Sequence, residues 1–336
     1  MKVVAFHQHG DVEQLAIEDW PIPEPGDGEI LIRVRAISFN GFDPMILQKT
    51  TGLKTPLPMV PCGDGAGEIS ALGPGVSRDW KVGDRVSVLP YGNFGMMGET
   101  AVGLAREYAV IPQDNLVLMP DAVSFEEAAA IPVAYGTAFR MMNVRGKIEN
   151  GERVFILGAA GGVGACCVQL AKLAGAEVIA ASSDDWKLEK LRALGADHLI
   201  NTKNDDFVKV IRNTFGKPRF DTNEGGVDVV INYIGGDTWA KSLRVLKRHG
   251  RMLTCGASAG YDPQTDIRYI WSFEQSIIGS DGWTKEDQKT LLEMCASGTL
   301  KPALHAVRPI DGFKTAMQEM VDRQVFGKSI ITLHDE

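Results

Sequence analysis

The stretch "VFILGAAGGVGACCVQLAKLAGAEVIAASS", residues 154–183, decides the fold of one half of the chain. It joins an apolar strand through a glycine-rich turn to a helix-forming segment, which leads into a second apolar strand. Glycines let the backbone turn sharply and approach a pyrophosphate, which the N-terminus of the following helix attracts. The pattern therefore favours a dinucleotide-binding βαβ unit over a plain tight β–α connection. The turn residues assigned to the dinucleotide are Gly158, Gly161, Gly162, Val163 and Gly164.

The end of the second strand predicts which dinucleotide binds. An Asp or Glu there would bond the ribose hydroxyls of NAD, whereas small or basic residues leave room for the 2′-phosphate of NADP. Ser182 and Ser183 occupy this place, and Lys187 follows close behind, so the sequence favours NADP. Asp184 and Asp185 come next, and a contact from either one to the ribose keeps NAD as the alternative.

The two halves of the chain differ in their secondary-structure pattern. Apolar strands alternate with helices through the middle of the chain, which is typical of a parallel sheet covered on both faces. Residues 1–120 contain short β-rich runs separated by Gly and Pro turns, which predicts an antiparallel barrel or sandwich. A chain of 336 residues usually forms two domains. We expect one domain at 1–125, completed by 280–336, and an α/β domain with a doubly wound parallel sheet at 126–279.

A helix is expected where the pattern changes. Ser124 and Glu127 have the spacing of a capping box, and helix formers follow them. Pro132 lies inside this run and is expected to kink or split the helix.

Composition and charge exclude several classes of partner. The net charge is −8 and the basic residues are scattered, which argues against nucleic acid or an anionic membrane as the main partner. No run reaches the roughly 18 apolar residues that a membrane span needs, and "MKVVAFHQHGDVEQL" has no signal-peptide pattern. The five cysteines show no CxxC spacing. We therefore expect a cytoplasmic protein.

The order and spacing of these segments resemble the medium-chain dehydrogenase/reductase superfamily over nearly the whole chain. Besides residues 154–183, the similarity rests on "PIPEPGDGEILIRVRA" (21–36), "GDGAGEISALGPGV" (63–76) and "GVDVVINYIGG" (226–236). The resemblance implies a GroES-like β-barrel catalytic domain, a Rossmann domain inserted within it, and an active site in the cleft between them. Members of the family are commonly homodimers or homotetramers.

The resemblance also implies that no metal is bound. Zinc alcohol dehydrogenases of this superfamily carry His-Glu in the loop similar to "CGDGAGE", where this chain has Gly63-Asp64. The first cysteine ligand matches Asn40, and the third ligand falls near Val133. A catalytic zinc needs about three protein ligands, and none of the matched positions carries a usual one. The glycines of 63–67 are expected to form a corner of the barrel.

Without a Lewis acid, an easier hydride acceptor is a quinone or a C=C conjugated to a carbonyl. The zinc-free branch, similar to quinone oxidoreductases and enoyl reductases, carries an Asn-x-x-Asp signature that "SFNGFDP" resembles. We assign Asn40 to the developing oxyanion and Asp43 to orienting the loop or a ribose, although both residues also suit a turn before Pro44. Tyr91 in "LPYGNFG" is the candidate proton donor, with a surface tyrosine as the alternative.

Four further residues are assigned to the cofactor. Thr137 matches a family threonine beside the nicotinamide, and Lys328 resembles a basic residue that reaches the cofactor from the tail. Asn232 and Gly256 directly follow strands of the parallel sheet, where ligands collect.

The leading hypothesis is an NADPH-dependent, zinc-free reductase of small quinones or α,β-unsaturated carbonyls. An enoyl-CoA or enoyl-thioester reductase is the first alternative, and an NADPH-binding protein with little catalysis is the second. An alcohol dehydrogenase would require a metal.

Overall fold

The computed structural model describes residues 1–334, which fold into two compact units. Unit 1 comprises Met1–Gly136 and the described part of Thr284–Glu336, and unit 2 comprises Thr137–Trp283. The structural divisions fall after residues 136 and 283, whereas the sequence analysis placed them after 125 and 279. Among the described residues, no helix combines the length and apolarity needed to cross a membrane.

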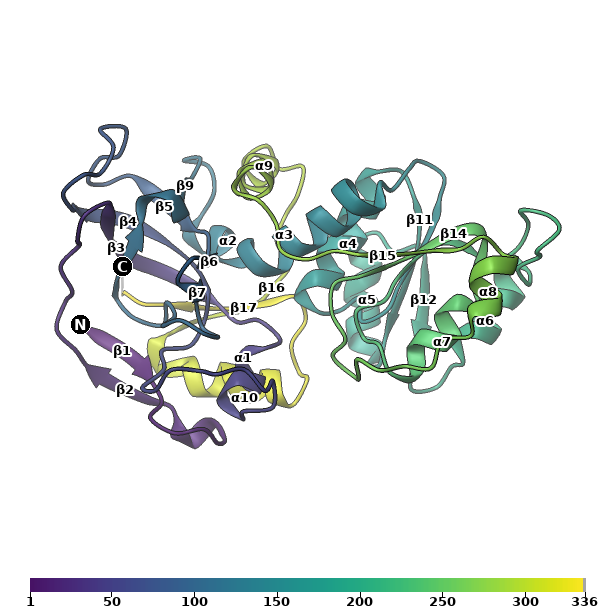
Figure 1. The fold of residues 1–336 in the computed structure, drawn as a ribbon, viewed down its shortest axis with the longest axis horizontal. Helices are drawn as coiled ribbons and strands as arrows, with labels where there is room; N and C mark the ends of the chain where they lie inside the picture. The colour runs from purple at the N-terminus through teal and green to yellow at the C-terminus, as the bar shows by residue number, and fades with distance from the viewer. Residues whose placement is uncertain (335–336) are drawn as a thin grey trace. The chain divides into compact units, whose positions relative to one another are not determined.

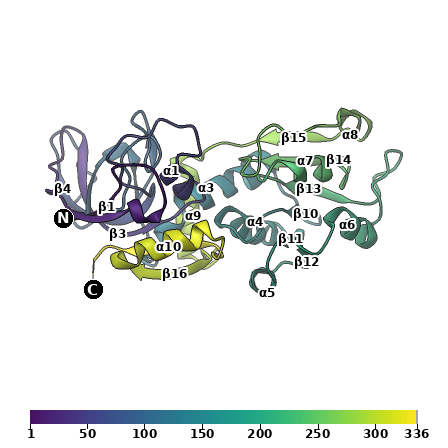
Figure 2. The same ribbon diagram turned by 90° about the horizontal axis from the view of Figure 1, so that it is seen from below.

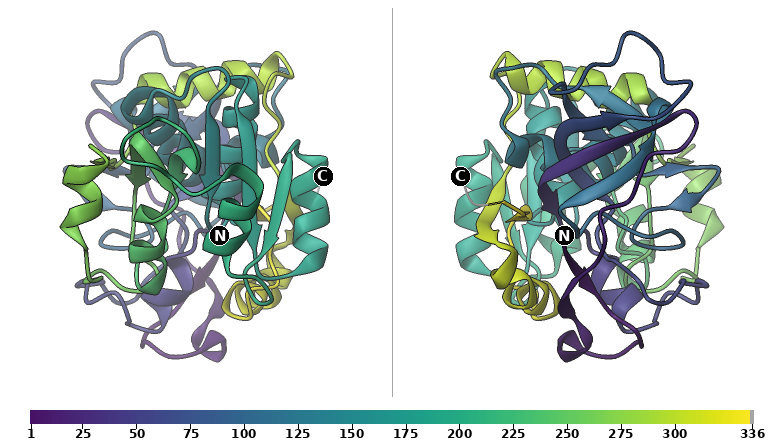
Figure 3. Two further views of the ribbon diagram at one scale, coloured as in Figure 1. Left: turned by 90° about the vertical axis from the view of Figure 1, so that its right-hand side faces the viewer. Right: turned by 90° about the vertical axis from the view of Figure 1, so that its left-hand side faces the viewer.

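Unit 1 is built on a seven-stranded sheet with the order β16-β17-β3-β4-β5-β9, and β8 pairs with the first half of β3. All pairs are antiparallel except β16 with β17. The strands of this sheet that come from the first part of the chain appear in purple and blue in the right panel of Figure 3. The strands are β3 (Glu29–Ser38), β4 (Asp64–Leu72), β5 (Arg85–Val88), β8 (Tyr108–Pro112), β9 (Leu116–Leu118), β16 (Leu304–Pro309) and β17 (Lys328–Thr332).

Strand β3 is the centre of this sheet, because it pairs with β4, β8 and β17. Its apolar side chains, including Ile30, Ile32 and Val34, are fully buried in the core of the unit. Two hairpins complete the β structure: β1 (Lys2–Ala5) with β2 (Ala16–Asp19), and β6 (Tyr91–Gly92) with β7 (Gly95–Met96).

Helices close the ends of unit 1. Ser124 and Glu127 form the predicted capping box of α2, which stops before Pro132, where α3 begins. Helix α10 packs beside β16 (Figure 2). The helices are α1 (Asp43–Leu47), α2 (Phe125–Ala130), α3 (Pro132–Phe139), α9 (Lys285–Ala296) and α10 (Phe313–Val321), with short turns η1 (Val12–Gln14), η2 (Gln113–Asn115) and η4 (Ile310–Gly312).

Unit 2 contains the predicted doubly wound parallel sheet. Its six strands run in the order β12-β11-β10-β13-β14-β15, so the chain order reverses between β10 and β13. In sheets of this kind ligands bind beyond the carboxyl ends of the strands, at the reversal. The strands are β10 (Arg153–Ile156), β11 (Glu177–Ser182), β12 (His198–Asn201), β13 (Val227–Ile231), β14 (Leu246–Thr254) and β15 (Ser276–Gly279).

Helices follow most of these strands, in teal and green in Figure 1. Helix α6 shows why they pack on the sheet: Phe207, Val208 and Ile211 fall on one helical face and are buried. The segment Arg140–Gly146 (η3) forms a π-helix after α3. The other helices are α4 (Gly162–Leu173), α5 (Asp185–Ala193), α6 (Phe207–Phe215), α7 (Asp237–Leu243) and α8 (Ile267–Ser272).

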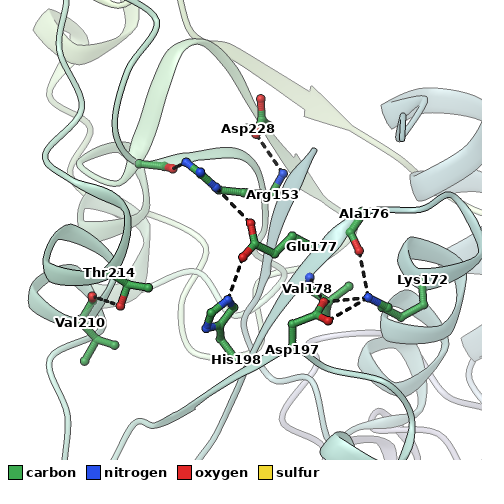
Figure 4. A network of polar contacts seen from close by, with 11 residues as sticks. Arg153, Lys172, Ala176, Glu177, Val178, Asp197, His198, Val210, Thr214 and Asp228 are labelled. Carbon is green, nitrogen blue, oxygen red and sulfur yellow. Dashed lines mark hydrogen bonds and ion pairs between the residues drawn. The ribbon is translucent and has the colours of Figure 1, made fainter. Parts of the chain in front are cut away.

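Charged side chains join the strands at the amino edge of this sheet (Figure 4). Glu177, at the start of β11, accepts hydrogen bonds from Arg153 of β10 at 3.2 Å and contacts His198 of β12 at 2.8 Å. Nearby, Lys172 donates to Asp197 at 2.8 Å. These side chains are about one third exposed or more, so the amino edge is closed by ion pairs that water reaches.

Candidate active site

Strand pairing in unit 1 gathers four polar side chains, which we call the buried cluster: Ser38, Asn40, Asp64 and Lys328. Ser38, the last residue of β3, lies opposite Asp64, the first residue of β4. On its other side Ser38 lies opposite Ile330 of β17, which brings the start of that strand to the same place. The cluster is therefore a consequence of where three strands begin or end.

An ion pair between Lys328 and Asp64 lies at the centre of the buried cluster. The Lys328 Nζ and the Asp64 Oδ2 are 3.0 Å apart, and their side chains are 2% and 0% exposed. Lys328 Nζ also donates to the carbonyl oxygen of Phe39 at 2.6 Å. The Ser38 hydroxyl donates to the carbonyl oxygen of Ala129 at 2.8 Å and lies 3.3 Å from Asp64 Oδ2. A buried pair is stable only when such additional hydrogen bonds satisfy both charges, and here they do.

The side-chain amide of Asn40 joins both members of the ion pair. Its Oδ1 accepts from Lys328 Nζ at 2.6 Å, and its Nδ2 donates to Asp64 Oδ2 at 2.9 Å. The ammonium has no acceptor and the carboxylate has no donor, so these two contacts fix which end of the amide is oxygen. The amide nitrogen carries a second hydrogen that Asp64 does not take.

Asp43 holds the turn that carries Asn40. Its carboxylate accepts from the backbone N–H of Asn40 at 2.6 Å and from that of Cys62 at 3.2 Å. Burial raises the pKa of Asp43 to about 7, although these two amide donors lower it. This geometry matches the turn-forming alternative for Asp43 and connects it to Asn40 through the backbone.

The three positions matched to zinc ligands do come together, but around Asp64. Asn40 donates to one of its oxygens, and the backbone N–H of Val133 donates to the other at 2.9 Å. Among residues 1–334, no group of three or more His, Cys, Asp or Glu side chains is placed to hold a metal ion. The donor set at this place does not fit zinc, because an ammonium already bonds its one carboxylate.

The glycines near Asp64 do not form the expected corner. Gly65 and Gly67 lie within strand β4, where a Cβ on Gly67 would come 2.1 Å from the carbonyl oxygen of Arg33 in the next strand. Glycine is required there because the backbones of β3 and β4 approach so closely.

Tyr91, the candidate proton donor, is half-buried in the short β6–β7 hairpin. Its carbonyl oxygen accepts from Asn115 Nδ2 at 2.7 Å, which ties the hairpin to the segment before β9. Its role as a proton donor remains a prediction.

The glycine-rich turn in unit 2 has the geometry of a phosphate-binding turn. Gly158 has φ +67°, and a Cβ on Gly164 would lie 2.5 Å from the carbonyl oxygen of Gly158, so both positions require glycine. Gly161 is the N-cap of α4 and supplies no side-chain cap to Gly162, Val163 or the rest of the first turn. A Cβ on Gly161 would meet only one protein atom, at 3.6 Å, so the space above it is open. A pyrophosphate fits this place.

Residues predicted to discriminate between NADP and NAD lie around the carboxylate of Asp184. Asp184 Oδ2 accepts from Ser183 Oγ at 2.9 Å and lies 3.4 Å from Lys187 Nζ. Lys203 Nζ donates to its Oδ1 at 2.5 Å. The hydrogen bond from Lys203, followed by that from Ser183, lowers the pKa of Asp184 to about 2. Lys203 was not predicted, because it follows the next strand rather than β11.

Ser182 ends β11 and is buried, and its carbonyl oxygen accepts from Thr202 at 2.9 Å. Asn232 is fully buried and donates to Ser242 at 2.9 Å, so its amide shapes the loop after β13. Gly256 follows β14 and lines a pocket of about 440 Å³ together with Trp239 and Tyr261. This pocket opens on the carboxyl side of the sheet, where a ligand is expected.

The remaining cofactor candidates lie at two places. Thr137 is half-buried in α3, at the first position of unit 2. Lys328 belongs to the buried cluster of unit 1. One residue that the sequence analysis missed is Tyr233, whose hydroxyl donates to the carbonyl oxygen of Gly158 at 2.8 Å and so lies against the glycine turn.

The fold and these two groups of residues define a GroES-like domain joined to a Rossmann domain, the architecture of nicotinamide-dependent oxidoreductases. Sequence models agree: the alcohol dehydrogenase GroES-like domain matches residues 26–121, and the zinc-binding dehydrogenase matches residues 162–297. The synaptic vesicle membrane protein VAT-1 homolog of Rattus norvegicus is 30% identical, over 96% of this chain and 81% of that protein. The chain belongs to the medium-chain dehydrogenase/reductase superfamily and is an oxidoreductase, as predicted.

Other relatives show the range of this superfamily. Quinone oxidoreductase of Homo sapiens is 27% identical, over 99% of this chain and 98% of that protein. Crotonyl-CoA reductase of Streptomyces avermitilis is 30% identical, over 89% of this chain and 77% of that protein. Among solved structures, an NAD-dependent alcohol dehydrogenase superimposes with a TM-score of 0.89 and 31% identity, covering 99% of this chain and 100% of its own.

Proposed function

We propose that this protein is an NADPH-dependent, zinc-free reductase that transfers hydride to a quinone or to the C=C of an α,β-unsaturated carbonyl. The observation that carries the proposal is the buried cluster, in which Lys328 and Asp64 hold the amide of Asn40 where related enzymes are expected to hold zinc. An amide N–H suits an acceptor whose charge develops on a conjugated oxygen, since that charge is already delocalised.

The residues of this chain act on the acceptor as follows. The glycine-rich turn of unit 2 would hold NADPH, which would supply the hydride. On the acceptor, negative charge develops on the conjugated carbonyl oxygen, and the second N–H of Asn40 would donate to that oxygen. Water or a side chain such as Tyr91 then supplies the proton that completes the reduction.

The choice of NADPH over NADH rests on the group around Asp184. Ser183 and Lys203 donate hydrogen bonds to that carboxylate, and Lys187 forms an ion pair with it at 3.4 Å. The same three donors suit the 2′-phosphate of NADP, which carries more negative charge than a carboxylate. NAD remains the alternative, since Asp184 itself can accept from ribose hydroxyls.

A reduction of enoyl-CoA or another enoyl thioester is the second candidate function. The relative named crotonyl-CoA reductase supports it, because it is 30% identical over 89% of this chain. The chemistry at the C=C is the same, and only the group attached to the carbonyl differs. An NADPH-binding protein with little catalysis is the third candidate.

We further propose a cytoplasmic homodimer or homotetramer. Strand β15 supports this, since it lies at the end of the sheet order and Ile277 within it is 39% exposed. An unpaired strand edge with an apolar side chain suits pairing with a second copy of the chain.

The test is NADPH oxidation with a quinone, an enone and crotonyl-CoA as separate acceptors, with the zinc content measured on the same preparation. The proposal predicts turnover of the quinone or the enone by metal-free enzyme. Turnover of crotonyl-CoA alone supports the second candidate, and tight NADPH binding without turnover supports the third.

A further inference from the structure

The buried cluster uses two charged groups whose role the reaction so far does not explain. Lys328 and Asp64 are almost fully buried, and removing two charges from water is costly before their attraction is counted. Lys328 was predicted to contact the cofactor, but its Nζ bonds three oxygens of unit 1: those of Phe39, Asn40 and Asp64. Its ammonium hydrogens are therefore all engaged inside the cluster, since an ammonium has three.

We propose that Lys328 and Asp64 are positioning residues that orient and polarise the amide of Asn40, so that its second N–H donates to the oxygen of the acceptor on which the negative charge of the enolate or hydroquinone anion develops. This inference rests on the proposed function. Lys328 draws electron density toward Oδ1, which makes the N–H groups of the same amide stronger donors. Asp64 fixes one N–H and thereby the direction of the other.

The geometry opposes a flipped amide at both of its ends. A flip by 180° exchanges the donor and the acceptor of an Asn side chain. Lys328 at 2.6 Å from Oδ1 and Asp64 at 2.9 Å from Nδ2 both oppose the flipped state. A flipped amide would present oxygen to the developing negative charge and repel it.

Val133 completes the support. It donates its backbone N–H to Asp64 Oδ1 at 2.9 Å, so both oxygens of the carboxylate accept hydrogen bonds. The positioning thus involves the ends of β3, β4 and β17 together with the start of α3.

The test is a double-mutant cycle between Lys328→Met and Asn40→Ala, read as kcat with the best acceptor and as the Kd for NADPH. Each single variant is expected to lower kcat about 10²-fold, the size of a lost oxyanion donor. The double variant is expected to lose no more than Asn40→Ala alone, because Lys328 acts through Asn40. The Kd for NADPH is expected to stay within about twofold of that of the unaltered protein in both single variants.

Asp64→Asn serves as a second route if Lys328→Met does not fold, and it is combined with Asn40→Ala in the same cycle. Lys314→Met is the matched control, because this exposed lysine also pairs with a carboxylate, that of Glu13 at 3.0 Å. It is expected to keep both kcat and Kd.

Three results overturn the inference. Additive losses of kcat in the double variants mean that Lys328 or Asp64 acts independently of Asn40. A raised Kd for NADPH with kcat intact means that Lys328 serves the cofactor, as the sequence resemblance implied. If the unaltered protein turns over no acceptor, the proposed function fails and takes this inference with it, a result distinct from the other two.

Discussion

The buried cluster of unit 1 and the ion pairs at the amino edge of unit 2 are both networks of opposite charges, but they differ in exposure. Lys328 and Asp64 are 2% and 0% exposed, whereas Arg153 and Glu177 are 39% and 40% exposed. Water screens the second pair, so it contributes little to stability. The first pair costs desolvation, so its presence alone is weak evidence that it stabilises the fold, and this agrees with the positioning role proposed for it.

The largest expected effect is a loss of folding stability when the ion pair of the buried cluster is broken. Asp64→Ala leaves the Lys328 ammonium buried without a counter-charge and is expected to lower the free energy of unfolding by about 3–5 kcal/mol. Chemical denaturation measures this. A loss below 1 kcal/mol would show that the two networks are energetically alike and would remove the basis of the comparison.

A substitution in the glycine-rich turn of unit 2 is expected to weaken NADPH binding without affecting folding. Gly161→Val is expected to raise the Kd for NADPH about 100-fold, because the added side chain fills the open space above the N-terminus of α4. Its melting temperature is expected to change little, since φ is −77° there and any residue adopts it. Gly164→Ala is the contrasting variant: its Cβ would meet backbone at 2.5 Å, so it is expected to lower the melting temperature. Unchanged binding in Gly161→Val would place the pyrophosphate elsewhere.

Asp43, beside the buried cluster, is expected to make the folding stability depend on pH. Burial raises its pKa to about 7 in the folded chain, above the ordinary value near 4 of the unfolded chain. Between these values the folded state keeps a proton that the unfolded state has lost, so stability falls as pH rises. The expected slope from this residue is up to about 1.4 kcal/mol per pH unit, ending near pH 7. Asp43→Asn is expected to remove that slope, and parallel curves for both proteins from pH 5 to 8 would contradict this.

A smaller effect, on cofactor binding, is expected at the residues around Asp184. Lys203→Met removes one exposed partner of Asp184 and is expected to weaken NADPH binding by about tenfold or less, with NADH binding unchanged. Binding titrations with both cofactors measure it. An equal loss for the two cofactors would argue against a 2′-phosphate at this place.

The smallest effect on folding stability is expected for the ion pairs at the amino edge of the unit 2 sheet. Glu177→Gln removes the charge that joins Arg153 and His198, and the free energy of unfolding is expected to fall by less than about 1 kcal/mol. Turnover is expected to stay unchanged. A loss as large as that of Asp64→Ala would show that exposure does not separate the two networks.

The sequence predicted what depends on local pattern. The glycine turn, the capping box of Ser124 and Glu127, and the split at Pro132 all follow from residues close together in the chain. Strand β16 and helix α8 were missed, because their side chains are partly exposed and show no clean apolar period. Hydrophobic periodicity in the sequence predicts only those helices and strands that bury one regular face.

The candidate site was predicted only in part. A short signature predicted roles for Asn40 and Asp43, and the structure joins the two residues by a hydrogen bond, while the roles themselves stay predictions. The sequence predicted for Asp64 only that it stands at a position where related enzymes have a zinc ligand. Its partner Lys328 lies 264 residues away, and strand pairing brings the two side chains together. Contacts of that kind depend on the register of the sheet, which a single sequence does not reveal.

The most direct test of a Lewis-acid-free hydride transfer is turnover of a quinone or enone by protein dialysed against a chelator, with bound zinc quantified in the same sample. We expect full activity to persist with zinc far below one ion per chain. Activity that disappears with the chelator and returns in proportion to added zinc would contradict it.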